Sequence, residues 1–186
     1  MRKAIFVFSL LGLMGIQNGC TTPTDSDLLF PKGNGAKMVT TGAQFDDMAG
    51  NSKKYLGHET MLAGALVSID QTDEGYLVLA KWLPYPKTKA DQGPKVGQSD
   101  GKRHFLIRFV GKREKVFYTT RGNLFLLEGQ VEGTKKALVN IFGNEEDLLY
   151  VDTKCVHIWE TGEGKISNDP SDSQYSETRE RTICAD

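Results

Sequence analysis

The thiol of Cys20 is the first group in this 186-residue chain whose position predicts a chemical modification. It follows Gly19 at the end of a leader in which Arg2 and Lys3 precede an apolar run at 4–16. About 13 apolar residues are too few to span a bilayer, but they suit the apolar region of a secretory signal. A small residue directly before the cysteine is what a lipoprotein signal peptidase requires. We therefore expect a signal peptide at 1–19 and acylation of Cys20.

Acylation of Cys20 would attach several fatty chains, palmitate among them, and several chains anchor a protein stably in a membrane. Thr21 rather than Asp follows the cysteine, which favours the outer membrane over retention in the inner one. The expected location is the outer membrane, with the domain facing the periplasm or the cell surface. Ordinary signal-peptide cleavage nearby is the alternative, because Gln17 stands where a small apolar residue is usual.

The two remaining cysteines, Cys155 and Cys184, form an even pair, which in an oxidising compartment predicts a disulfide. Val156 and Ile158 mark the core-facing side of the last predicted strand. Cys155 then points outward, where a C-terminal tail can reach it. A pair of free thiols and a bond between two chains are the alternatives.

Metal binding and catalysis find little support in the sequence. Cys155 and His157 share one face of a strand and could both contact Zn²⁺, but two more ligands would be needed. The chain contains neither a Cys-x-x-Cys nor a His-x-x-His motif, and it lacks the Gly-x-Ser-x-Gly element of serine hydrolases. The acidic run at 145–147 has no EF-hand spacing and is typical of a solvated turn. We expect no metal, no cofactor and no enzymatic activity.

One basic loop is the best candidate for recognition, because it combines cations with aromatic rings: Lys112, Arg113, Lys115, Phe117 and Tyr118. On a small barrel in the cytosol such a loop would indicate nucleic acid. Export argues against that partner. So does the charge, since the chain beyond the leader has 21 basic against 24 acidic residues. We expect a solvated connection whose aromatic rings close one end of the barrel. Recognition of an envelope protein, a lipid headgroup or a glycan by this loop is the alternative.

Hydrophobic periodicity predicts one short helix at 44–55 and then a change to strands. Alternation within the strand at 124–131 places Phe125 and Leu127 in the core and Glu128 outside. Strands separated by turn residues favour a small OB-like antiparallel β-barrel, with a β-sandwich as the alternative. The predicted strands are 61–69, 76–83, 103–110, 124–131, 135–142 and 148–159.

The domain organisation follows from these assignments. The signal peptide at 1–19 precedes a lipidated flexible tether at 20–42, which is rich in Thr, Asp, Gly and Pro. The barrel domain occupies 43–160. A polar, acidic tail at 161–186 completes the chain, with Cys184 as its point of attachment.

Several short segments of the chain form a recognisable series: Tyr-Leu-Gly-His at 55–58, Leu-Ala-Gly-Ala-Leu-Val at 62–67, Gly-Lys-Arg-His-Phe at 101–105, Leu-Glu-Gly-Gln-Val-Glu-Gly at 127–133, Leu-Tyr at 149–150 and His-Ile-Trp at 157–159. Through these segments the chain resembles the starvation-inducible outer-membrane lipoprotein (Slp) family over about 45–159. Ala63 replaces the first glycine of a Gly-Gly pair typical of that family, and neither its Phe-Leu-Asp-Pro segment nor its Tyr-Pro before the last strand is present. The resemblance implies an envelope lipoprotein linked to stress or starvation and brings no catalytic residue.

Two functions are compatible with these patterns. The first is a non-enzymatic envelope protein with a structural or partner-binding role. The second is a carrier that holds a small molecule, lipid or glycan in the barrel mouth. Phe105, Phe109 and Phe125 are bulky enough to fill a small barrel, which favours the first.

Overall fold

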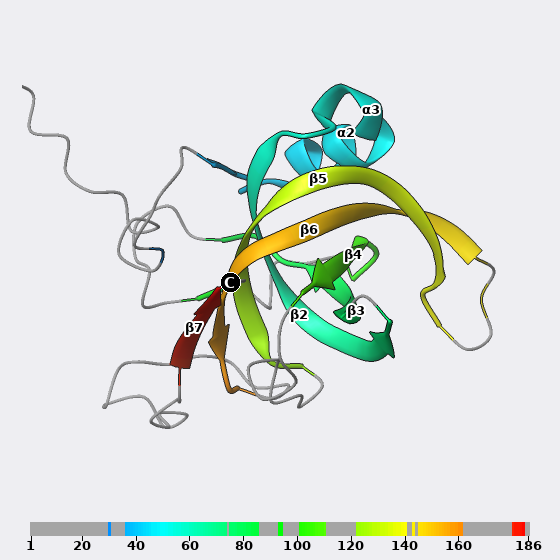
Figure 1. The fold of residues 1–186 in the computed structure, drawn as a ribbon. Helices are drawn as coiled ribbons and strands as arrows, with labels where there is room; N and C mark the ends of the chain where they lie inside the picture. Colours follow the sequence, from blue (N-terminus) through cyan, green and yellow to red (C-terminus); the bar gives the residue numbers. More distant parts are fainter. Residues whose placement is uncertain are drawn as a thin grey trace, which may run out of the picture.

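The computed structural model describes residues 30, 36–73, 75–85, 93–94, 101–110, 122–140, 143, 145–161 and 180–184. Strands dominate the fold, and the helices lie together at one end of it (Figure 1). The elements are β1 (Lys37–Met38), α2 (Gly42–Gly50), α3 (Ser52–Tyr55), β2 (Glu59–Thr72), β3 (Gly75–Trp82), β4 (His104–Phe109), β5 (Leu124–Leu138), β6 (Glu145–Trp159) and β7 (Glu180–Cys184).

Five of the strands close into a barrel, which confirms the predicted fold class. The hydrogen-bonded order runs β2–β3–β4–β6–β5, and β5 returns to β2 along the register from Glu59↔Gln130 to Ala65↔Leu124. This last pairing excludes the β-sandwich, because it closes the five strands into a single sheet and a sandwich consists of two separate sheets. One barrel pairing, between β4 and β6, is parallel, so the barrel is not antiparallel throughout.

Side chains fill the barrel interior. We call this set the inner core; its largest fully buried members include Phe105, Phe109 and Phe125. Gly64 lies where β2 bends past them, and a Cβ at this position would come within 2.6 Å of the Lys81 carbonyl oxygen and 2.9 Å of the Phe125 ring. A strand this close to its neighbour therefore requires glycine.

The predicted separation of strands 124–131 and 135–142 is wrong, because β5 continues through Gly133 and Thr134 as one 15-residue strand. Its register against β6 shifts between Val131 and Gly133, and Gly133 has a positive φ of 110°. The glycine thus forms a bulge that bends the strand without reversing it. The partner strand β6 is likewise unbroken and begins at Glu145, so the acidic residues at 145–147 pair with β5 and do not form a turn.

A second apolar layer, the outer cluster, lies on the opposite face of β2, β5 and β6. Leu126 and Trp159 belong to it, and Phe30 and Tyr85 come to it from outside the barrel strands. Glu128 faces this side, as predicted, but it is only 3% exposed, so the expectation that it is solvated is wrong. The complete cluster is Phe30, Met61, Ala63, Leu83, Tyr85, Leu124, Leu126 and Trp159.

The strand β7 extends the sheet at the end of β6, and the Cys155–Cys184 disulfide joins the two strands. Val156 and Ile158 face the inner core, whereas Cys155 packs against the outer cluster. The predicted intramolecular bond and the predicted orientation of this strand are both confirmed.

Candidate functional site

The two short helices form one wall of the candidate site. Thr41 caps α2 with a reciprocal box, in which its hydroxyl accepts from the Gln44 amide and the Gln44 side chain accepts from the Thr41 amide. Phe45 anchors the helix to the inner core. The centre of its ring lies 5.5 Å from that of Trp82 and 6.0 Å from that of Phe105. Arg103 ties α2 from the side through two 2.7 Å hydrogen bonds to Asp46. These contacts hold the helix against the barrel.

A pocket of about 510 Å³ lies between this wall and the edge of the sheet. Val39 and Met48 are buried, which makes the base of the pocket apolar. A volume of this size falls within the range of small-molecule sites. Its lining residues are Lys37, Met38, Val39, Gln44, Asp47, Met48, Lys54, Tyr55, His58, Glu59 and Thr60.

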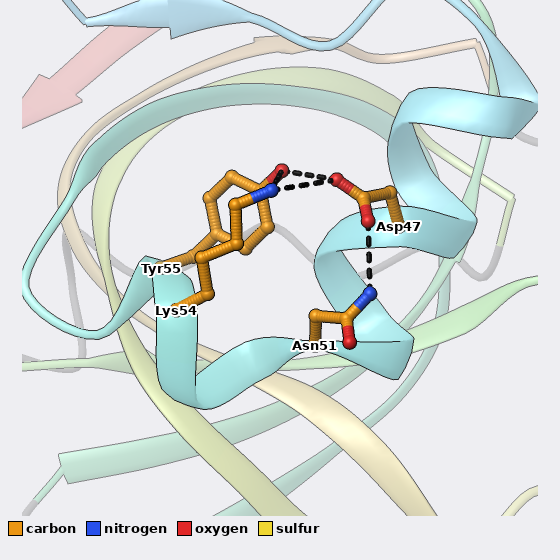
Figure 2. A network of polar contacts seen from close by, with 4 residues as sticks. All are labelled: Asp47, Asn51, Lys54 and Tyr55. Atoms are coloured by element: carbon orange, nitrogen blue, oxygen red, sulfur yellow. Dashed lines mark hydrogen bonds and ion pairs between the residues drawn. The ribbon is translucent and has the colours of Figure 1, made fainter.

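A network of polar side chains joins the two helices at the rim of this pocket (Figure 2). Asp47 accepts hydrogen bonds from the Tyr55 hydroxyl and, at 2.8 Å, from the Asn51 amide. Lys54 donates to the Tyr55 oxygen at 3.2 Å and lies 3.5 Å from the Asp47 carboxylate. The network therefore fixes the Tyr55 ring, whose other neighbour is His58 at 5.8 Å between ring centres.

The charges of this network are stable near neutral pH. Hydrogen bonds from Tyr55 and then from Asn51 hold the pKa of the Asp47 carboxyl below its usual value. The hydrogen bond to Tyr55, followed by the charge of Asp47, raises the pKa of the Lys54 ammonium. Both shifts move the pKa of the group further from pH 7. A general acid or base works best with a pKa near the operating pH. The arrangement suits binding better than proton transfer.

The negative charge of Glu59, the second acidic residue of the pocket, is also paired. Glu59 forms an ion pair with Lys154, which reaches it from β6. Among the described residues, Lys37 has neither an ion pair nor a side-chain hydrogen bond. The pocket therefore carries a cation in excess of its paired charges.

The structure places the predicted residues Cys155, His157 and Cys184 away from this pocket. Cys155 is bonded to Cys184, so its thiolate is not available to a metal shared with His157. The His157 ring contacts the Thr182 hydroxyl at 2.8 Å and Glu180 at 3.4 Å, both from β7. Burial lowers the pKa of His157, and it also lowers the pKa of His104 at the start of β4.

Two groups of predicted residues lie outside the described part of the chain. These are Cys20 and the basic loop with Lys112, Arg113, Lys115, Phe117 and Tyr118. The pocket is not evident from the sequence. The tether predicted at 20–42 includes Lys37 and Met38, which form an edge strand parallel to β2. The spacing of Thr41 and Gln44 was the available signal, because a capping box marks where a helix begins.

The comparisons with known proteins add no relative. No family model matches the chain, and no similar protein was found among curated proteins or among solved structures. Within the described ranges, no three His, Cys, Asp or Glu side chains gather in a way that could hold a metal ion. None of the described helices has the length and apolar character needed to cross a membrane.

Proposed function

We propose that the protein is a non-enzymatic, lipid-anchored envelope lipoprotein of the Slp type, held in the outer membrane through Cys20. The observation that carries the proposal is the leader, with Arg2 and Lys3, the apolar run and the Gly19–Cys20 junction. The spacing of these features matches what cleavage by a lipoprotein signal peptidase and acylation of the cysteine require. The glycine-containing segments that resemble the family support the same conclusion.

The filled barrel interior supports a structural or partner-binding role over a carrier at the barrel mouth. Phe105, Phe109 and Phe125 are each 0% exposed, and the aliphatic side chains around them complete the inner core. A barrel packed in this way holds side chains in place of a ligand. Binding then takes place on the outside, where a protein partner or a small molecule has access.

The site chemistry supports a role without catalysis. Asp47 and Lys54 stay charged around neutral pH, and each is bound to Tyr55. A pair of this kind stabilises helix geometry and presents a fixed surface. An envelope protein is the partner class that fits the proposed location.

Replacement of the anchor residue tests the proposal. In Cys20→Ser we expect loss of palmitate labelling and release of the protein into the soluble envelope fraction, because the acceptor thiol is gone. The double variant Cys155→Ser/Cys184→Ser is the control, and it keeps both the label and the membrane association. Unchanged fractionation of Cys20→Ser with membranes would contradict the proposal.

A further inference from the structure

The pocket beside α2 combines residues that no element could bring together alone. Gln44, Asp47 and Met48 share one face of α2 at the i, i+3 and i+4 positions. Tyr55 and His58 close one end, and β1 with the start of β2 forms the opposite wall. The site is thus a built cavity on the outside of the barrel.

Its apolar surface is fixed before any ligand arrives. Met48 is 7% exposed and Val39 is 3% exposed, so both are held by the inner core beneath them. The Tyr55 ring is half-buried, and its hydroxyl is bound to Asp47 (Figure 2). A pre-positioned aromatic and aliphatic surface lowers the entropy cost of binding an apolar group.

Its polar surface favours an anion. Asp47 accepts hydrogen bonds from the side chains of Asn51, Tyr55 and Lys54. Glu59 is paired with Lys154. Lys54 donates two of its three protons to the network, which leaves one directed elsewhere. Lys37, on the opposite wall, is exposed and has no charged partner among the described residues. A carboxylate between the two walls would gain charge-assisted hydrogen bonds.

We propose that this pocket binds a small alkyl carboxylate, with its anionic head at Lys37 and Lys54 and its chain over Met48 and the Tyr55 ring. The inference goes beyond the envelope role proposed above and does not require the lipid anchor. It places a ligand on the outside of the barrel, in a site that the packed interior leaves untouched.

Three probes with the same chain test the head-group preference: octanoate, octan-1-ol and octylammonium. The protein is the exported chain with Cys20→Ser, which needs no detergent. Methyl NMR of labelled methionines gives a local readout, because Met48 lines the pocket from α2 whereas Met61 lies in the outer cluster. We expect octanoate to shift the signal of Met48 and to leave that of Met61 unchanged. Octan-1-ol binds more weakly, and octylammonium produces no saturable shift.

Matched lysine variants test the contact itself by calorimetry with octanoate. Lys37→Gln should weaken binding about tenfold, since one charge-assisted hydrogen bond is lost. Lys53→Gln removes the same charge from an exposed residue of α3 outside the pocket, and it should change binding by less than about twofold.

Three outcomes overturn the inference: equal binding of the three probes, equal effects of Lys37→Gln and Lys53→Gln, or a saturable shift confined to Met61. Because the Cys20→Ser chain is used throughout, failure of this test leaves the anchor proposal standing. Failure of the palmitate labelling experiment likewise leaves the proposal about the pocket standing.

Discussion

The two faces of β5 are both buried over residues 124–129, but by different means. On the inner face, Phe125 and Leu127 pack against the other barrel strands, so closure of the barrel is enough to cover them. On the outer face, Leu126 and Trp159 are covered by residues distant in sequence, such as Phe30 and Tyr85. The inner face therefore depends on the barrel alone, whereas the outer face depends on attached segments.

The largest expected effect is in the inner core. Phe125→Ala should destabilise the protein by about 3–5 kcal/mol in urea unfolding, because it leaves a cavity among strands that cannot collapse. An effect below 1 kcal/mol would show that the interior is loosely packed.

Adjacent leucines make the comparison sharper. Leu126 and Leu127 are both 0% exposed and differ only in the face they occupy. Leu127→Ala should cost more than Leu126→Ala, because the attached segments over the outer cluster can relax into a void. The reverse order would break the distinction between the two faces.

Loss of the disulfide should have the next largest effect. The bond joins cysteines 29 residues apart, and Cys155→Ser/Cys184→Ser should cost about 3–4 kcal/mol in the chain-entropy model. In a Trp82→Phe background, the emission of Trp159 should also shift to the red as β7 separates from β6. An unchanged midpoint and spectrum would mean that pairing alone holds this strand.

A smaller effect is expected at Glu128, whose side chain is buried beside the register partner Cys155. Glu128→Ala should destabilise by about 1–3 kcal/mol, because it removes the packing of a buried side chain. Glu132 is exposed on the same strand, and Glu132→Ala should stay within about 0.5 kcal/mol. If the two variants shift the urea unfolding transition equally, the Glu128 side chain is not buried.

The smallest expected effect is a pH dependence of folding stability that arises from His157. Burial lowers the pKa of His157, so the unfolded chain takes up a proton near its ordinary pKa of about 6.5 before the folded chain does. Stability should therefore fall as the pH drops through that value. His157→Gln should reduce the slope, and His104, shifted the same way, accounts for what remains. Asp46 and Asp47 have lowered pKa values and stay charged in this window. A constant urea midpoint between about pH 7.5 and 5.5 would contradict this assignment.

Much of the barrel was accessible from the sequence because strands alternate with a period of two. Phe125, Leu127, Val156 and Ile158 were assigned to the core on that basis, and all four lie there. The same alternation placed Cys155 outside, where it meets Cys184. The anchor at Cys20 and the recognition role of the basic loop stay predictions.

Alternation fixes which side of a strand faces inward, but it does not say which strand lies next to it or what covers the other side. The closure of β2 on β5 and the parallel pairing of β4 with β6 are long-range contacts. The burial of Glu128 and the pocket around Tyr55 depend on segments that meet only after folding. The sequence by itself therefore determined most of the barrel strands, their inner face and the cysteine pair. Only the tertiary structure decided the outer surface, because burial there comes from neighbours that no local pattern records.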